Sequence, residues 1–148
     1  MTGADLEKVA GIYAEIVKRH PSNADALDAS AEFLWSIDWR SDAMAQWETA
    51  ETLAPKNAEI ANHLGGCHLA LGNAKRATEY FERAAQLDPE SALYHFNAGN
   101  TCFVFRREIS DATHDADAVM LRALDHFRQA ALLEPFNAEY ARSFAETF

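Results

Sequence analysis

Small and apolar residues recur along the chain at spacings of three and four, which is the period of an amphipathic helix. One such set near the middle consists of Ala61, Leu64, Gly65 and His68. A second set follows at Ala77, Phe81 and Ala84, and polar residues fill the positions between. The pattern predicts helices with the approximate bounds 3–19, 24–36, 40–53, 58–71, 74–87, 92–107, 116–133 and 138–147.

The four prolines mark the turns between pairs of these helices. Pro21, Pro55 and Pro89 are 34 residues apart, and Pro135 follows after a further 46 residues. Proline cannot continue a helix, and each proline is followed two positions later by a side chain that can cap the next one. These predicted caps are Asn23, Asn57, Ser91 and Asn137. A constant period of this length indicates a stacked repeat of two helices.

Other positions recur with the same period. Gly65 and Gly99 are predicted to let two helix backbones approach closely, with Phe81 and Phe127 filling the space beside them. Trp47 holds the corresponding position one repeat earlier. The pair Gly72-Asn73, and Asp38 at the equivalent point, are predicted to break the chain between the two helices of a repeat.

Leu64, Gly65, Ala77, Phe81 and Pro89 match the pattern of the tetratricopeptide repeat, so the chain resembles that family. It departs from the pattern at residues 61 and 68, where the family favours aromatic side chains. The resemblance implies an all-α fold, a right-handed α-α superhelix of about eight antiparallel helices in one domain. Its expected segments are a half-repeat at 3–21, repeats at 24–57, 58–91 and 92–137, and a capping helix at 138–148.

The third repeat is twelve residues longer than the others because of an insert at 106–117. The preceding helix is expected to run on by one turn, and Ser110, Asp111 or Thr113 would then cap the next helix. The simpler interpretation is a longer helix pair with a solvated loop. The alternative is a lid on the edge of a binding groove, with Arg106 and Arg107 as its contacts.

In the tetratricopeptide repeat family, one stripe of each first helix lines the concave groove. The resemblance assigns to it Asp25, Asp28, Glu32, Trp35, Glu59, Asn62, Leu69, Leu93, Phe96, Asn100 and Phe103. The stripe is acidic at its N-terminal end and apolar at its C-terminal end, which predicts a partner peptide or helix with basic and apolar residues. An alternative is that Phe96 and Phe103 are covered by the insert or by the C-terminal helix.

The acidic end of the stripe also argues against one known class of partner. Some members of the family grip the acidic tails of heat-shock chaperones with a clamp of Lys, Arg and Asn. Here Asp25, Asp28 and Glu32 would repel such a tail. We therefore expect no co-chaperone activity of that kind.

Charge and composition restrict the remaining classes. The chain carries 13 basic and 23 acidic residues, a formal net charge of −10, which disfavours nucleic acid and anionic membranes as partners. Its two cysteines, Cys67 and Cys102, do not make a disulfide framework. The N-terminus has no apolar signal core and no stretch long enough to cross a bilayer, so we expect a cytoplasmic protein.

No motif for a nucleophile or a phosphate-binding loop occurs, so we expect neither an enzyme nor a cofactor. The loop residues Asp111, His114, Asp115 and Asp117 do not have the spacing of a calcium site. A zinc site built from His63, Cys67, His68 and His95 is disfavoured because the pattern places His68 in the helix packing. We expect no metal.

Two further functions remain open beside an adaptor. The size, acidity and three repeats are similar to class II chaperones of type III secretion systems. The chain could also be a structural segment that stacks on other repeats. Tyr140, Phe144 and Phe148 have no following helix to cover them, which suggests either a longer parent protein or a homodimer through the terminal helices.

Overall fold

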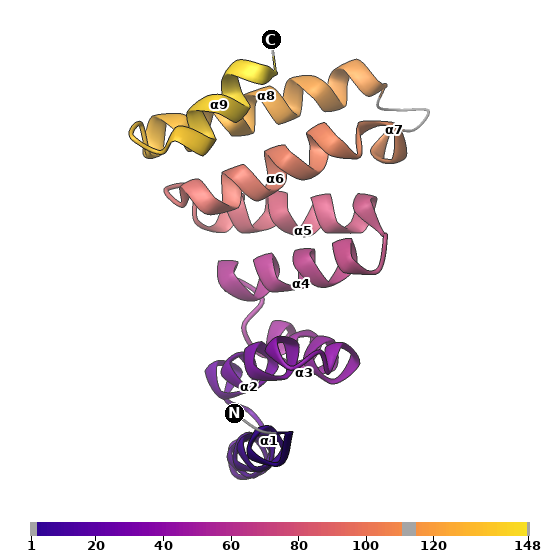
Figure 1. The fold of residues 1–148 in the computed structure, drawn as a ribbon, viewed down its shortest axis with the longest axis vertical. Coiled ribbons are helices and arrows are strands. Elements are labelled where there is room, and N and C mark those ends of the chain that lie inside the picture. Colours follow the sequence, from indigo (N-terminus) through magenta and orange to yellow (C-terminus); the bar gives the residue numbers. More distant parts are fainter. Residues whose placement is uncertain (1–2, 111–114, 148) are drawn as a thin grey trace. The chain divides into compact units, whose positions relative to one another are not determined.

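The structure, a computed structural model, describes residues 3–110 and 115–147. Within these ranges all regular structure is helical (Figure 1). The helices are α1 (Gly3–Arg19), α2 (Ala24–Ser36), α3 (Arg40–Leu53), α4 (Ala58–Ala70), α5 (Ala74–Leu87), α6 (Ala92–Val104), α7 (Arg106–Ile109), α8 (Ala116–Leu133) and α9 (Ala138–Glu146). Among the described residues, no helix is both long and apolar enough to cross a lipid bilayer.

The chain divides into two compact units, residues 1–64 and 65–148. Helix α4 begins in the first unit and ends in the second. The organisation of residues 1–148 as one repeat domain remains a prediction.

The predicted helix caps are confirmed. Oδ1 of Asn23 accepts a hydrogen bond from the amide of Ala26 over 3.1 Å. Asn57, Ser91 and Asn137 accept from the first turns of α4, α6 and α9 in the same way. Each cap satisfies an amide that has no partner inside its helix, which explains why the helix bounds could be predicted so closely.

The predicted breaks between the two helices of a repeat are also confirmed. Gly72 has a φ of 74° and Asp38, one repeat earlier, has a φ of 67°. Both residues therefore adopt the left-handed conformation that ends a helix, which glycine reaches freely and aspartate only at a cost. The same backbone conformation thus separates α2 from α3 and α4 from α5.

The first unit has its core along α2. This helix packs against both α1 and α3. Leu27 and Ala31 on α2 and Trp47 on α3 are buried, which confirms the predicted core position of Trp47. The ring of Tyr13 on α1 stacks on Phe33 with centroids 5.2 Å apart, so α1 joins this core through an aromatic contact.

The second unit repeats one contact between a glycine and a phenylalanine. A Cβ placed on Gly65 would lie 2.7 Å from the ring of Phe81, and one on Gly99 would lie 3.0 Å from the ring of Phe127. The distance at Gly65 is shorter than real Cβ atoms show, and the distance at Gly99 is tighter than most real Cβ contacts. Both glycines therefore allow the close packing of their helix pairs. In Figure 1, α5, α6, α8 and α9 form successive layers, in agreement with their contacts.

The inserted segment differs from the prediction at its start. Helix α6 ends at Val104 instead of continuing to residue 107, and α7 forms a separate turn. Ile109 on α7 is buried in a cluster with Cys102, Val119 and Phe127, and Phe105 packs against the same cluster. Burial of these apolar side chains explains why the chain leaves the axis of α6 at this point.

The cap at the end of the insert also differs from the prediction. Oδ1 of Asp115 accepts from the amide of Ala118 over 2.7 Å and begins α8. The hydroxyl of Ser110 instead donates to the carbonyl oxygen of Arg107 over 3.0 Å. Asp111 and Thr113, the other two expected caps, lie outside the described residues. Asp115 has the extended backbone that an N-cap requires, immediately before the first helical residue.

The C-terminal helix covers its own aromatic residues, contrary to our expectation. Tyr140 is buried in a cluster with Ala92 and Ala130, and its ring lies 4.9 Å from that of Phe96. Phe144 is half-buried against the cluster around Phe127. Helix α9 thus turns Tyr140 and Phe144 onto side chains of α6 and α8. Phe148 lies outside the described residues.

Candidate functional site

The acidic stripe on α2 occupies one face of the helix. Asp25 and Glu32 are exposed, whereas Asp28 between them is half-buried. These residues follow a spacing of three and four, so their carboxylates lie along one line. The sequence predicted that these carboxylates share one face of the helix, but not that Asp28 is half-buried while Asp25 and Glu32 are exposed.

Asp28 is held in place by the core of the first unit. The indole Nε1–H of Trp47 donates a hydrogen bond to Oδ1 of Asp28 over 2.7 Å. The same oxygen lies 3.0 Å from Nδ1 of His63 on α4. Because a carboxylate can only accept, Nδ1 of His63 carries the proton. Two donors thus fix this carboxylate.

His63 brings together carboxylates from two helices. Its Nε2 lies 3.5 Å from Oε1 of Glu32, and Glu59 precedes it by one turn of α4. One ligand atom from each of Glu32, Glu59 and His63 lies within 4.8 Å of the other two. The ring of His63 also packs 4.8 Å from that of Trp47. We call Asp28, Glu32, Glu59 and His63 the acidic cluster.

The acidic cluster changes the charge state of its histidine. Burial alone lowers the pKa of His63, but the hydrogen bond with Asp28 and the charges of Asp28, Glu32 and Glu59 outweigh it. The pKa of His63 is therefore raised above its ordinary value of 6.5. A site of this kind stabilises positive charge, either on the imidazole or on a cation from outside.

The sequence did not predict the convergence on His63. It placed Glu32 and Glu59 on the groove stripe and considered His63 only in a zinc site with Cys67, His68 and His95. The usable signal was the spacing of four between Glu59 and His63, which puts both on one face of α4. Cys67 is buried, as expected for a small apolar residue.

The end of the acidic stripe is aromatic. The half-buried ring of Trp35 packs 5.8 Å from Trp47, and the guanidinium of Arg40 lies 5.3 Å from the centroid of Trp35. Asn62 on α4 is half-buried. Trp35 is therefore partly accessible, and the guanidinium of Arg40 lies over its ring.

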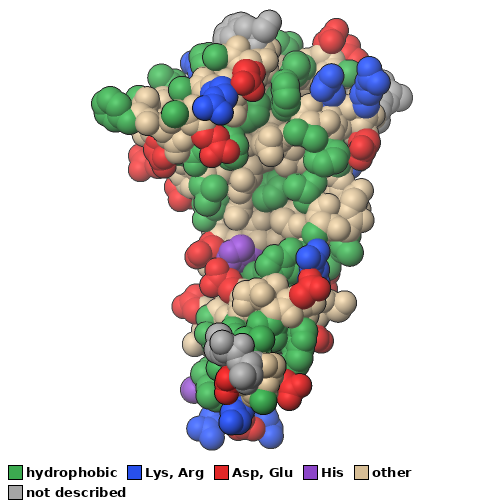
Figure 2. All heavy atoms as spheres, viewed as in Figure 1, with side chains coloured by type: hydrophobic (Ala, Val, Ile, Leu, Met, Phe, Trp, Pro, Cys, Tyr) green, Lys and Arg blue, Asp and Glu red, His purple; other side chains and the backbone are tan. Residues whose placement is uncertain are grey.

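The predicted stripe in the second unit is apolar. Leu93 is 49% exposed, Asn100 is exposed, and Leu69 packs against the cluster of Ala77 and Phe81. Phe96 and Phe103 are half-buried, with their ring centroids 6.0 and 6.2 Å from that of Phe127. We call Leu93, Phe96 and Phe103 the apolar stripe. On the face shown in Figure 2, exposed apolar and acidic side chains occur on both units.

The insert contacts the apolar stripe through Arg106. Its Nη1 donates to the carbonyl oxygen of Phe103 over 3.0 Å, and its guanidinium lies 5.9 Å from the centroid of that ring. Arg107 is exposed. Each of the two half-buried rings is thus partly covered, as the alternative interpretation expected. Arg106 of the insert covers part of Phe103, and Tyr140 of α9 covers part of Phe96.

A second polar cluster, which the sequence did not predict, joins α5, α6 and α8. Nε of Arg122 donates to Oε1 of Glu82 over 2.8 Å, and Nε2 of His126 lies 3.7 Å from the same oxygen. Burial raises the pKa of Glu82, but its bonds to His126 and Arg122 outweigh burial and lower it. The Nδ1 atoms of His126 and His95 are 3.1 Å apart. These half-buried contacts link successive repeats.

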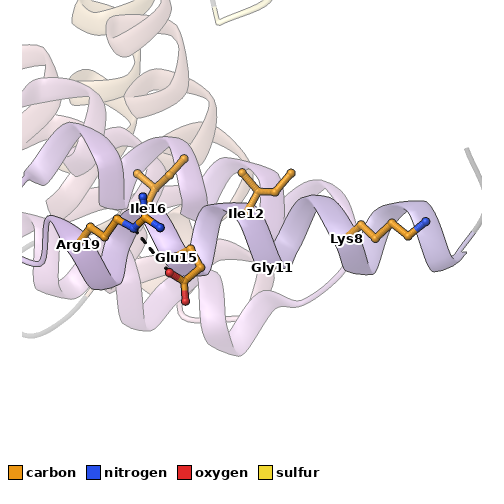
Figure 3. A pocket seen from close by; sticks show the side chains of 6 residues that line it. All are labelled: Lys8, Gly11, Ile12, Glu15, Ile16 and Arg19. Atoms are coloured by element: carbon orange, nitrogen blue, oxygen red, sulfur yellow. Dashed lines mark ion pairs between the residues drawn. The ribbon is translucent and has the colours of Figure 1, made fainter.

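One hollow of the first unit is shallow and lies along one helix. It has a volume of about 590 Å³ and is lined by Lys8, Gly11, Ile12, Glu15, Ile16 and Arg19 (Figure 3). Ile12 and Ile16 are 60% and 39% exposed, and an ion pair joins Arg19 to Glu15 over 3.7 Å. All six residues belong to α1, so the hollow is an open helix face and not an enclosed pocket.

Comparisons with known proteins agree with this fold. The family model for the tetratricopeptide repeat matches residues 58–91. The Hsp70-Hsp90 organizing protein of Triticum aestivum is 33% identical over 86 residues, which cover 58% of this chain. The match spans only 15% of the length of that curated relative.

Two solved structures are similar over most of the chain. The crystal structure of MamA has a TM-score of 0.79 and 16% identity, covering 97% of this chain and 72% of that one. The first tetratricopeptide repeat domain of Spaghetti, bound to the HSP90 peptide SRMEEVD, has a TM-score of 0.68 and 14% identity, covering 84% of this chain and 89% of that one. The predicted all-α fold is confirmed. Residues 58–91 match the tetratricopeptide repeat, and the solved structures share the all-helical fold of this chain.

Proposed function

We propose that the chain is an adaptor that binds a peptide or helix of a partner protein carrying both basic and apolar residues. The observation that carries this proposal is the acidic cluster, in which the exposed carboxylates of Glu32 and Glu59 converge beside His63. Lysine or arginine of a partner would complete an arrangement that already stabilises positive charge. No catalytic chemistry is needed for this function.

The apolar stripe supports the proposed preference for apolar residues in the partner. Leu93 presents about half of its surface to solvent, and the rings of Phe96 and Phe103 on the same helix are half-buried. Apolar side chains held by core packing lose little freedom when a partner covers them, so they suit anchoring. We infer that the acidic cluster of the first unit takes basic residues of a partner. We infer separately that the apolar stripe of the second unit takes apolar residues.

The comparisons support a second candidate function. The wheat relative is named as an organizing protein of Hsp70 and Hsp90, and the Spaghetti domain is bound to an acidic HSP90 peptide. Such a peptide would place its carboxylates against Asp25, Asp28 and Glu32 if it lay along the predicted stripe of α2. Like-charge contacts of this kind disfavour binding, so we rank the basic partner first.

A peptide-binding experiment separates the two candidates. The first probe is a fluorescent amphipathic peptide with lysines on one face and leucine and tryptophan on the other. The second is the same peptide with each lysine replaced by glutamate, and the third is SRMEEVD. We expect anisotropy to rise with the first probe and to fall back as salt screens the charges. Binding of SRMEEVD in preference to the lysine peptide would overturn our ranking.

Matched variants locate the binding. The double substitution Glu32→Gln and Glu59→Gln should weaken the lysine peptide by roughly 2- to 10-fold, the range for a few exposed ion pairs. The control is Glu79→Gln with Glu90→Gln, which changes the net charge equally at exposed positions outside the cluster. Leu93→Ala should weaken the same peptide without affecting the fold. Equal affinity for all variants would contradict the proposed surfaces.

A further inference from the structure

The acidic cluster contains an arrangement that suits a metal ion. Glu59 and His63 lie one turn apart on α4, and Glu32 faces them from α2. One carboxylate oxygen of each glutamate and one ring nitrogen lie within 4.8 Å of one another. Two helices therefore bring a nitrogen ligand and two oxygen ligands to one point.

The histidine is oriented as a metal ligand requires. Its Nδ1–H is bound to Asp28 over 3.0 Å, which leaves Nε2 as the atom that faces Glu32 at 3.5 Å. Metal-binding histidines commonly donate their other ring N–H to a carboxylate, which fixes the ring and its tautomer. Asp28 is in turn held by the indole of Trp47, a buried residue outside the ligand set.

Packing restricts the same ring further. The centroid of the Trp47 ring lies 4.8 Å from that of His63. The imidazole is therefore held by a hydrogen bond at one edge and by an aromatic contact on one face. This makes the cluster more than a group of exposed acids, because its nitrogen ligand is fixed before any ion arrives.

We propose that Glu32, Glu59 and His63 form a binding site for Zn²⁺. Imidazole and carboxylate ligands suit zinc, and three protein ligands leave a fourth position for water or for a group of another molecule. The two glutamates supply the charge that balances the ion. Where His63 is protonated, the ion displaces the proton on Nε2 to solvent and no redox step is involved.

The distances are close to those that zinc needs. Ligand atoms about 2.0–2.2 Å from a tetrahedral ion lie about 3.4 Å from one another. Nε2 of His63 and Oε1 of Glu32 are 3.5 Å apart already. Glu32 and Glu59 are exposed, so rotation of their side chains can bring the remaining oxygen into range. Mg²⁺ and Ca²⁺ favour six or more oxygen ligands, and the site offers fewer.

Calorimetric titration of the metal-free protein with Zn²⁺ tests the proposal. We expect one ion per chain and an affinity that falls by at least ~10-fold in the variant Glu32→Gln/Glu59→Gln. The variant Glu79→Gln/Glu90→Gln should bind zinc as the unaltered protein does. Circular dichroism checks that each variant is folded, which we expect because the four substituted residues are exposed.

Two further measurements identify the ligands directly. Co²⁺ in place of zinc should give the weak visible bands of nitrogen and oxygen ligands without the intense near-ultraviolet band of a thiolate, which separates this site from Cys67 and Cys102. The NMR signals of the His63 ring should shift on addition of zinc. Asp28→Asn should weaken zinc binding while leaving all three ligands in place.

Three results would overturn the proposal: no zinc binding, unchanged binding by the Glu32→Gln/Glu59→Gln variant, or a thiolate spectrum with cobalt. The first would mean that the acidic cluster is only a closed ion pair of His63 with its carboxylates. Zinc and a basic side chain of a partner would compete for the same carboxylates of Glu32 and Glu59. The metal is therefore tested with zinc alone and without peptide, so the failure of one proposal is distinguishable from the failure of the other.

Discussion

The indole N–H of Trp47 donates a hydrogen bond of 2.7 Å to Oδ1 of Asp28, so a buried ring of the core positions a carboxylate of the candidate site. Asp28 holds His63 in the same way, with 3.0 Å between the carboxylate oxygen and Nδ1. Stability and binding are therefore connected through three side chains. A change that removes the indole donor should affect both.

Trp47→Phe should lower the free energy of unfolding by about 1–3 kcal/mol. The half-buried carboxylate of Asp28 loses a donor, and the smaller ring leaves part of the core unfilled. Urea denaturation followed by far-ultraviolet circular dichroism measures the change. Trp39→Phe is the control, because Trp39 is 44% exposed, and it should stay within about 0.5 kcal/mol of the unaltered protein. Equal effects of the two substitutions would contradict the assigned role of Trp47.

Gly65→Ala should destabilise the protein by about 1–3 kcal/mol, because its Cβ would lie 2.7 Å from the buried ring of Phe81. Gly66→Ala, one position later, meets no heavy atom within 4 Å. That substitution should be neutral or stabilising by up to about 1 kcal/mol, since alanine favours helix more than glycine does. Thermal unfolding of the two variants compares them directly. Recovery of stability on adding Phe81→Leu to Gly65→Ala would identify the clash as the cause.

Acidification should destabilise the second unit through His95. Burial is the largest cause that lowers its pKa, and the adjacent His126 adds to it, against the raising effects of Pro89 O, Asp125 and Asp88. Between the two pKa values of His95, the unfolded chain therefore binds a proton at this histidine and the folded chain does not. The stability that His95 contributes is present above pH about 6.5 and is lost as pH falls toward the lower folded pKa.

Replacement of the histidine isolates this effect. The variant His95→Gln should lose less stability than the unaltered protein between pH 7.5 and pH 5.5, as measured by urea denaturation at both values. Glu82, whose pKa is lowered by His126 and Arg122, should add a further loss below its ordinary pKa of 4.5. An identical pH dependence with and without His95 would show that other groups control the response.

Cys102 should be almost unreactive in the folded protein. Burial raises the pKa of its thiol to about 11, and the negative charge of Glu82 contributes to the shift. Near pH 8 this leaves a thiolate fraction about 100-fold below that of an ordinary cysteine thiol. The rate of reaction with a thiol reagent, in a Cys67→Ala background, should rise by at least that factor when urea unfolds the chain. A native rate close to the unfolded rate would contradict the burial of this thiol.

The helices could be predicted closely from sequence because their ends are determined locally. The caps of Asn23, Asn57 and Asn137 act within three residues, and Gly72 needs no distant partner to adopt its positive φ. The exception is the end of α6. There Phe105 and Ile109 enter a cluster with Val119, a residue of the next long helix, and burial replaces the expected helical turn. Such a contact cannot be recognised from periodicity alone.

The candidate site could be predicted only in part for a related reason. Helical phase indicates that Asp28 and Glu32 share a face of α2, and it indicates the same for Glu59 and His63 on α4. Helical phase does not indicate which residues of α2 contact which residues of α4. The opposed atoms at 3.0 and 3.5 Å depend on the packing of side chains such as Trp47, which sequence phase assigns only to the core.

The glycine–phenylalanine contact shows how the family tolerates insertions. Phe81 follows Gly65 by 16 residues and Phe127 follows Gly99 by 28, yet both rings fill the same place beside their glycine. The family model matches residues 58–91, the repeat with the shorter interval. Within this chain, the contact between the two helices is thus kept while the length of the connecting chain differs by twelve residues. A sequence pattern that requires a glycine and a phenylalanine in contact, at any interval between them, would therefore recognise repeats that carry an insertion.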